Sequence, residues 1–369
     1  MKKVLFLIHD LSGGGAEKVL TNLVNNMDPN RFDVTVQVLF GGGTNEQLLK
    51  EHVKLKRVFP KMIPGNSHWM KLLSPAALHW LFVREHYDIE VSYLEGPSAR
   101  VVSGCRDPET KLVCWIHVEQ KTAQKACRSF RSQKEAVACY NRFDRLIGVS
   151  ETVKQDFCSI LPITADMDVL YNTIESGTIL EKAAEPVEFR DLPPRTIKLV
   201  SVGTLKPVKG LDRLIRIVGK VSDMGYPVHL FLLGRGPDET KLRTLAQECG
   251  VADKVSFLGY QSNPYKYVAN CDLYICASHA EGFSTAATEA LIVGTPVCTT
   301  EVSGMREMLG DSEYGLITEN SEKALLQGVM KLLRDPELLS YYKEQAKARG
   351  LAFSTERTVK AVEDMLDGL

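Results

Sequence analysis

The sequence predicts an α/β protein built from two Rossmann-like domains. A chain of 369 residues is too long for one typical hydrophobic core. Short apolar strands alternate with amphipathic helical segments, which indicates parallel sheets covered by helices on both faces. The alternation stops once and begins again, so the chain is expected to hold two such domains.

The first series of strands occupies the N-terminal half. Five apolar runs are expected as strands: Val4–Ile8, Asp33–Leu39, Ile89–Leu94, Lys111–Ile116 and Arg145–Val149. Segments between them, such as Ala16–Met27 and Ser129–Phe143, carry a helical pattern. The first domain is therefore predicted to extend over residues 1–175.

A charged segment with three prolines separates the two series, and residues 176–195 are predicted as the linker. Five further strands then follow: Ile197–Val202, Val228–Leu233, Val255–Leu258, Leu273–Cys276 and Val297–Thr300. The second domain is assigned to residues 196–350. Beyond Pro336 the pattern is helical to the end of the chain.

Composition excludes several classes of protein. A net charge of −1 argues against a nucleic-acid binder. Nine cysteines without a C-x-x-C pair indicate a reduced, cytoplasmic protein. The apolar run Val4–Ile8 is too short for a signal peptide, and no run approaches the roughly 20 apolar residues of a membrane span.

The segment from Glu281 to Glu289 is the most informative part of the sequence. It reads E-G-F-S-T-A-A-T-E, and a helix is expected to begin at Ser284 or Thr285. The N–H groups of a helix N-terminus suit a diphosphate, and two carboxylates beside it can hold sugar hydroxyls. This combination predicts a nucleotide-sugar pocket. In the alternative, Glu281 is a loop carboxylate and Glu289 a solvated helix residue.

Glycines follow the first predicted strand. Gly14 and Gly15 there allow the backbone to approach a ligand, with a helix N-terminus facing it. Lys18 stands where a dinucleotide fingerprint needs its third glycine, so that motif is absent. A plain tight turn is the alternative interpretation.

Polar groups and glycines also follow later strands. Lys209, after the first strand of the second domain, can neutralise a diphosphate leaving group without a metal ion, unless it is simply solvated. His117 ends the strand Lys111–Ile116, where a lone histidine can also be structural. Gly234 and Gly259 follow further strands, where glycine mostly serves turns.

No metal site is predicted. Asp166 and Asp168 form a D-x-D pattern, but it precedes the predicted strand Val169–Tyr171 and reads as a solvated turn. No other cluster has metal-ligand spacing. Neither a P-loop nor a nucleophile elbow is present, which excludes P-loop kinases and hydrolases of that kind.

Two basic tracts lie in the first domain, at residues 54–71 and 121–145. Tryptophan and leucine side chains accompany the first tract. Such a combination can hold a protein on an anionic membrane, and here it would be the inner face of the plasma membrane. Solvated helix faces are the alternative interpretation.

The frame E-G-F-x(5)-E-A-x(3)-G-x-P-V, which begins at Glu281, resembles the signature of the retaining glycosyltransferases of family 4. Further matches to that family run from Gly13 to Gly315. The resemblance implies the GT-B fold, with two facing domains and the active site in the cleft between them. It assigns the acceptor to the first domain and the donor to the second, and it implies that helix 354–366 crosses back to the first domain.

The resemblance also implies roles for residues of the second domain. Lys209 would bind the donor phosphates. The family usually has an arginine where this chain has Thr204, and Lys206 is our hypothesis for the missing charge. Glu281 would orient the donor sugar, and Glu289 would bind the ribose hydroxyls.

The resemblance also implies roles for His117 and for several glycines. His117 would touch the transferred sugar, although Val118 replaces the aspartate that many relatives carry next. The remaining donor-binding positions are Gly14, Gly15, Gly234, Gly259, Gly282, Phe283 and Ser284.

The implied activity is transfer of a sugar from a UDP- or GDP-sugar to a hydroxyl of a saccharide or lipid-linked glycan, with the anomeric configuration kept. Neither a metal nor another cofactor is expected, and cell-surface polysaccharide synthesis is the expected setting. Two alternatives stay open: a sugar-nucleotide epimerase of the same architecture, and a non-catalytic nucleotide-sugar-binding protein.

Overall fold

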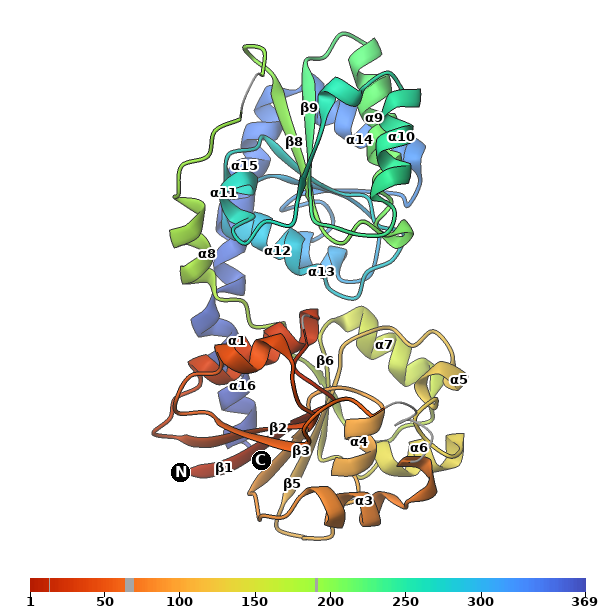
Figure 1. The fold of residues 1–369 in the computed structure, drawn as a ribbon, viewed down its shortest axis with the longest axis vertical. Coiled ribbons are helices and arrows are strands. Elements are labelled where there is room, and N and C mark those ends of the chain that lie inside the picture. The colour runs from red at the N-terminus through yellow and green to blue at the C-terminus, as the bar shows by residue number, and fades with distance from the viewer. Residues whose placement is uncertain (13, 64–69, 190–191) are drawn as a thin grey trace. The chain divides into compact units, whose positions relative to one another are not determined.

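The computed structural model describes residues 1–12, 14–63, 70–189 and 192–369. The chain divides into two compact units (Figure 1). Unit 1 comprises Met1–Ile174 and Thr355–Leu369, and unit 2 comprises Glu175–Ser354. Each unit is an α/β domain around one parallel sheet, as the sequence predicts.

The sheet of unit 1 has the strand order β3-β2-β1-β4-β5-β6-β7, and every pair is parallel. Its strands are β1 (Lys2–Ile8), β2 (Phe32–Phe40), β3 (Lys54–Phe59), β4 (Ile89–Ser92), β5 (Lys111–Ile116), β6 (Arg145–Gly148) and β7 (Met167–Val169). The order reverses between β1 and β4. Ligands of such sheets bind beyond the carboxyl ends of the strands at this point.

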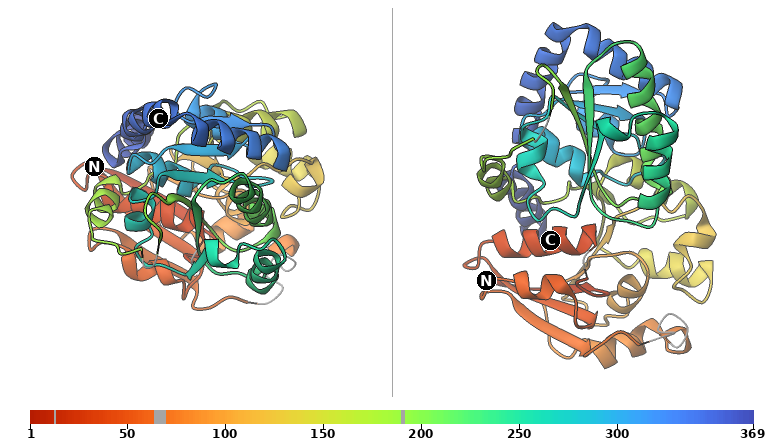
Figure 2. Two further views of the ribbon diagram at one scale, coloured as in Figure 1. Left: turned by 90° about the horizontal axis from the view of Figure 1, so that it is seen from above. Right: turned by 45° about the horizontal axis from the view of Figure 1, so that its top comes forward.

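Helices cover both faces of the unit 1 sheet (Figure 2). They are α1 (Gly15–Asn26), α3 (Pro75–Phe82), α4 (Pro97–Val102), α5 (Ala123–Ala126), α6 (Gln133–Tyr140), α7 (Glu151–Ile160) and α16 (Thr355–Asp367), with 3-10 turns η1 (Thr44–Leu48) and η2 (Met70–Leu72). The C-terminal helix α16 packs against α1. Arg31 binds Glu363 at 2.6 Å, and the Lys2 ammonium donates to the Leu366 carbonyl at 2.9 Å. Both termini therefore lie in unit 1 (Figure 1).

The sheet of unit 2 has the order β10-β9-β8-β11-β12-β13 and is also parallel throughout. Its strands are β8 (Ile197–Val202), β9 (Val228–Leu233), β10 (Val255–Gly259), β11 (Leu273–Cys276), β12 (Val297–Thr300) and β13 (Leu316–Thr318). The order reverses between β8 and β11, which makes the carboxyl ends of these two strands the expected ligand position.

The helices of unit 2 bury an aliphatic core against this sheet. They are α8 (Ser176–Ala183), α9 (Leu211–Asp223), α10 (Glu239–Glu248), α11 (Tyr265–Ala269), α12 (Thr285–Ile292), α13 (Met305–Leu309), α14 (Glu322–Arg334) and α15 (Pro336–Gly350), with η3 (Pro207–Lys209), η4 (Ala252–Lys254) and η5 (Leu351–Phe353). Leu214, Val218, Leu230 and Ile275 are fully buried in that core. Across the described ranges, no helix combines the length and apolarity needed to cross a bilayer.

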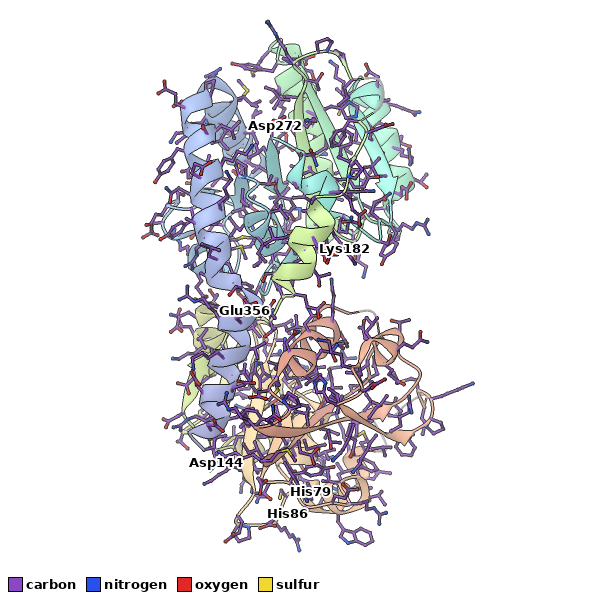
Figure 3. All side chains as sticks on the ribbon, turned by 90° about the vertical axis from the view of Figure 1, so that its left-hand side faces the viewer. His79, His86, Asp144, Lys182, Asp272 and Glu356 are labelled. Atoms are coloured by element: carbon purple, nitrogen blue, oxygen red, sulfur yellow. The ribbon has the colours of Figure 1, made fainter. Side chains whose placement is uncertain are left out.

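The predicted linker differs from the structure. Residues Ser176–Ala183 form α8, which packs against α11 and α12 and belongs to unit 2. The Asn263 amide donates to the Lys182 carbonyl at 2.8 Å, which fixes α8 to that unit (Figure 3). The prolines that mark the linker in the sequence come after this helix. Unit 2 is accordingly longer at both ends than the predicted 196–350.

Three other elements were misjudged. Lys54–Phe59, interpreted as part of a basic tract, is the edge strand β3, in which three cations stand among half-buried leucine, valine and phenylalanine side chains. The strand expected at Val169–Tyr171 begins at Met167, so Asp168 lies within β7. Helix α6 begins at Gln133 rather than Ser129, because the Ser132 hydroxyl caps it by accepting from the Glu135 amide.

Candidate functional site

The loops that follow β8 and β11 meet at the point where the unit 2 sheet reverses its order. The His279 amide donates to the Val208 carbonyl at 2.8 Å. Gly210 has φ 59°, and a Cβ there would lie 2.1 Å from the Ala277 carbonyl oxygen. Only glycine allows this approach. The close contact brings Lys209 and Glu281 to one place.

Lys209 and Glu281 form an ion pair, with 2.6 Å between Nζ and Oε1. The Ser278 hydroxyl donates to the same Oε1 at 2.5 Å. The side chains of Lys209 and Glu281 are 28% and 12% exposed, so both remain open to a ligand. A cation and a carboxylate at one accessible point can serve a phosphate and a sugar hydroxyl together.

Helix α12 begins directly after Glu281, as predicted. The Ser284 hydroxyl accepts from the Ala287 amide at 3.3 Å and caps the helix. Glu289 follows inside the helix, half-buried, and the Tyr265 hydroxyl donates to it at 3.4 Å. Gly282 and Phe283 pack against Gly304, where a Cβ would lie 2.8 Å from the Phe283 ring.

Close backbone contacts explain two glycines of the donor side. Gly234 has φ 136°, and a Cβ there would lie 1.9 Å from the Gly203 carbonyl oxygen. Its amide donates to the Gly259 carbonyl at 2.8 Å, which links the ends of β9 and β10. Thr204 and Lys206 lie exposed between Gly203 and Lys209.

Arg235 is a candidate that the sequence analysis missed. It is exposed at the end of β9, and a Cβ on Gly259 would lie 3.7 Å from its Nε atom. Its carbonyl accepts from the Leu205 amide at 3.1 Å, beside Thr204. The variable position of the G-x-G-P turn gave no signal, because only the structure brings the backbone of Arg235 next to the loop in which Thr204 stands at the position of the usual arginine.

His117 lies in unit 1, at the carboxyl end of β5. It is buried, 8% exposed, with its ring 4.9 Å from that of Tyr93. Burial lowers the pKa of His117 to about 4, so the imidazole is neutral at pH 7. Its Nε2 atom is buried without a hydrogen-bond partner in the described part of the chain. A buried polar atom of this kind calls for a ligand or water.

A carboxylate holds the loop that carries His117. Glu95 accepts from the His117 amide and from the Gln120 side chain, each at 3.0 Å. Burial raises the pKa of Glu95. The backbone amide of Gln120 also donates to the Asp156 carboxylate at 2.6 Å. The sequence gave no indication of Glu95, since it comes from a different strand.

Gly14 and Gly15 lie at the start of α1, also in unit 1. A Cβ on Gly14 would lie 2.1 Å from a carboxylate oxygen of Glu17, whereas a Cβ on Gly15 would meet open space. Burial and the nearby Asp10 raise the pKa of Glu17. The Glu17 side chain can turn away from such a Cβ, so neither position requires glycine for steric reasons, and the exposed Gly15 leaves its backbone accessible.

The basic tracts are largely occupied by internal bonds. In tract 121–145, Arg131 donates to the Lys71 and Leu72 carbonyls at 2.5 and 2.7 Å, and Arg142 to the Ser103 and Cys105 carbonyls. In tract 54–71, Lys54, Lys56 and Arg57 pair with Asp33, Glu85 and Glu46. Residues 64–69 of that tract lie outside the described residues.

One group of metal-ligand types comes together in unit 1: His79, Glu90 and Cys105. Its members come from three separate elements, so spacing could not reveal it. His79 Nε2 lies 2.9 Å from Glu90, and His79 is labelled in Figure 3. Burial opposes its charge, yet Cys105 and Glu90 together raise the pKa of His79 to about 9. The contact between His79 and Glu90 and the raised pKa are those of a half-buried ion pair.

Comparison with known proteins shows the family of the chain. Residues 13–177 match the family described as Glycosyltransferase Family 4, and residues 187–349 match Glycosyl transferases group 1. The two matches cover both units of the fold. The chain belongs to the family 4 glycosyltransferases, and its two Rossmann-like domains are those of the GT-B fold.

Individual relatives include bacterial glycan enzymes. The chain is 36% identical over 221 residues to the Campylobacter jejuni N-acetylgalactosamine-N,N'-diacetylbacillosaminyl-diphospho-undecaprenol 4-alpha-N-acetylgalactosaminyltransferase, covering 59% of this chain and 57% of that one. It is 27% identical to Rhizobium meliloti LpsD, a lipopolysaccharide core biosynthesis glycosyltransferase, over 97% and 95% of the two chains. Anabaena HepE, solved with UDP, has the same fold, with TM-score 0.77 and 20% identity over both full chains.

Proposed function

We propose that this protein is a retaining glycosyltransferase that uses a UDP-sugar donor. The Lys209–Glu281 ion pair at the reversal point of the unit 2 sheet carries this proposal, because α12 begins beside it. Sheets of this kind bind ligands at that point, and a helix N-terminus there favours a diphosphate. HepE, solved with UDP, supports the choice of nucleotide.

The reaction would proceed through charge stabilisation at this site. As the glycosidic bond breaks, negative charge grows on the diphosphate, and Lys209 together with the amides that follow Glu281 would stabilise it. The Glu281 carboxylate would accept a hydrogen bond from a hydroxyl of the donor sugar. The Glu289 carboxylate would accept hydrogen bonds from the ribose hydroxyls. The leaving phosphate would take the proton of the acceptor hydroxyl, so the new bond forms on the face of the old one. No metal is needed in this scheme.

Arg235 and Lys206 would supply the cation that Thr204 does not. Both side chains are exposed, that of Lys206 after β8 and that of Arg235 at the end of the neighbouring strand β9. An arginine can bind a phosphate with two parallel hydrogen bonds, whereas Lys206 acts as a point charge. We therefore assign the larger share of this role to Arg235.

Nucleotide binding is the first test. Melting temperature is measured with UDP, GDP, CDP and ADP, each with and without EDTA. Ligand at 100 times Kd adds about 2.7 kcal/mol, which is a shift of several degrees. A UDP-specific shift that survives EDTA is expected. No shift with any nucleotide would instead favour a protein without donor binding.

Product analysis then separates the enzyme classes. The selected UDP-sugar is incubated with saccharide and lipid-linked acceptors, and proton NMR of the product reports the anomeric configuration. A product with the donor's configuration is expected. Inversion would contradict the retaining assignment, and conversion of the UDP-sugar without an acceptor would identify an epimerase.

We further propose a lipid-linked acceptor and an anionic membrane surface as partners of unit 1. The Campylobacter relative's name specifies an undecaprenol-linked acceptor. Leu72 and Trp80, on η2 and α3, are 79% and 71% exposed. The Arg84 guanidinium lies 5.4 Å from the centre of the Trp80 ring. Exposed tryptophan and leucine beside a cation suit the interface of a bilayer on the cytoplasmic side.

Vesicle binding tests this partner. Full-length protein is sedimented with vesicles of phosphatidylglycerol and phosphatidylcholine, beside a Leu72→Ser/Trp80→Ser variant. The variant is expected to lose most of its binding to the anionic vesicles. Leu351→Ser, at a residue 70% exposed in unit 2, is the matched control. Equal binding by all three proteins would contradict the assignment.

A further inference from the structure

The Ser278 hydroxyl, 2% exposed, is the buried partner of Glu281. It donates to Glu281 Oε1 at 2.5 Å, and the Cys276 thiol lies 3.6 Å from its oxygen. Burial and the nearby Glu281 raise the pKa of Cys276, which keeps the thiol protonated. The thiol can therefore donate to Ser278, whose own proton is directed to the carboxylate.

The loop that carries Ser278 is anchored on both sides. The buried Thr300 hydroxyl at the end of β12 donates to the Ser278 carbonyl at 2.7 Å. The next residue, His279, is held through its amide by Val208 and through its carbonyl by the Asn320 amide at 3.0 Å. The buried Arg213 also contacts the His279 ring. Ser278 is thus fixed before any ligand arrives.

The two oxygens of Glu281 differ in their surroundings. Oε1 accepts hydrogen bonds from Ser278 and Lys209, whereas no donor among the described residues reaches Oε2. Lys209 is 28% exposed and can turn toward an incoming diphosphate. Ser278 is buried and has no such freedom. When Lys209 turns, Ser278 is the contact that still holds Oε1.

We infer that Ser278 is a positioning residue for Glu281: its hydroxyl fixes Oε1 while Lys209 serves the diphosphate, and so presents Oε2 to a hydroxyl of the donor sugar. The inference rests on the proposed function. It goes beyond it by assigning different tasks to the two oxygens and by naming the group that keeps them apart.

A double-mutant cycle tests this inference. The rate of UDP release from the selected UDP-sugar is measured for the wild type, Ser278→Ala, Glu281→Gln and the double variant. A hydrogen bond to a charged group corresponds to about 10- to 100-fold in kcat, which is the loss expected for Ser278→Ala alone. In the Glu281→Gln background the same change is expected to cost less than about twofold, since the oriented carboxylate is already absent.

The control is Ser256→Ala, which removes a serine hydroxyl outside the site. The Ser256 Oγ atom lies 2.8 Å from His229 Nε2 and forms a hydrogen bond with it. It is expected to leave kcat unchanged. Equal losses from Ser278→Ala in both backgrounds would overturn the inference and assign Ser278 a purely structural role. Wild-type turnover in Glu281→Gln would instead overturn the role of Glu281, while absence of UDP release from the wild type with every donor and acceptor would contradict the proposed function.

A binding measurement covers the case of slow turnover. Titration calorimetry compares UDP with the UDP-sugar. Ser278→Ala is expected to keep the wild-type affinity for UDP and to lose the additional affinity contributed by the sugar. Unchanged affinity for both ligands would contradict the inference. Loss of UDP affinity in a variant that keeps the wild-type melting temperature would also contradict the inference, because Ser278 would then support the phosphate site.

Discussion

The carboxyl edges of the two sheets present different chemistry. In unit 2 the edge holds an accessible ion pair between Lys209 and Glu281. In unit 1 the edge holds a buried, neutral His117 and a loop fixed by Glu95, and no described residue bonds the His117 Nε2 atom. The strand order is similar in both units, and unit 1 also keeps an ion pair at this edge, between His9 and Asp10. The difference lies at the end of β5, where His117 is buried and neutral.

The same fold can therefore serve two kinds of recognition, that of a diphosphate and that of a hydroxyl group. Charges that stay accessible suit a diphosphate, whose own charge changes during the reaction. A neutral imidazole in a desolvated position suits a hydroxyl, which it can meet as donor or acceptor without a change of charge. Substitutions in one unit at a time can separate the two kinds of recognition.

Removal of the Glu281 charge is expected to have the largest effect. Glu281→Gln keeps the shape of the side chain, so UDP affinity should remain while kcat falls by about 100- to 1000-fold, the range seen for key groups that stabilise a transition state. UDP release measures the rate. Glu301→Gln, exposed at the end of β12, is the control. A rate within threefold of wild type would remove Glu281 from the mechanism.

Lys209→Met should act on binding as well as on rate. The loss of a charge-assisted contact to the diphosphate is expected to weaken UDP binding by about 10- to 100-fold. Calorimetry measures the affinity. Lys220→Met removes a lysine of unit 2 that pairs with Glu322 outside the site, and it should bind UDP normally. If both variants bind UDP equally well, Lys209 is not the phosphate ligand.

His79 predicts a pH dependence of stability in unit 1. Its pKa of about 9 in the folded state exceeds its ordinary value of 6.5. The stabilisation is therefore complete below pH 6.5 and is lost as the pH rises toward 9, by about 1–3 kcal/mol. Urea unfolding across this range measures it. His79→Gln should remove the loss, whereas His86→Gln, at an exposed histidine labelled beside it in Figure 3, should retain it.

His117→Asn should produce the smallest effect. The loss of one neutral hydrogen bond is expected to lower kcat by about five- to tenfold and to leave UDP affinity unchanged. Because the pKa of His117 is about 4, wild-type turnover should show no inflection from this group between pH 5 and 8. His52→Asn, which contacts the Val24 carbonyl in the same unit, is the control. A fall in UDP affinity would place His117 at the nucleotide.

The fold was predictable from local pattern. Buried parallel strands such as Val228–Leu233 are continuous apolar runs, so their number and order along the chain were clear. The edge strand Lys54–Phe59 was missed, because its three cations read as a charged surface, whereas the edge strand β10 was predicted. The helix Ser176–Ala183 was taken for linker, since its contacts with α11 and α12 depend on residues some eighty positions away.

The candidate site was predictable where one segment carries it. Glu281, Ser284 and Glu289 lie on a single turn and helix, and their spacing identified them. Of the groups that reach the site from other strands, Lys209 was predicted, whereas Ser278 and Arg235 were not. Ser278 gives no local signal without knowledge of where Glu281 points, and Arg235 matters only because β9 ends beside the loop of Thr204.

Hydrogen–deuterium exchange of the full chain, with and without UDP in the presence of EDTA, tests the central claim most directly. We predict the strongest protection in the loops of unit 2 that contain Lys209, Gly234 and Glu281, and no change in the loop of His117. Protection confined to unit 1, or none in either unit, would contradict the assignment of the nucleotide site to the carboxyl edge of the unit 2 sheet.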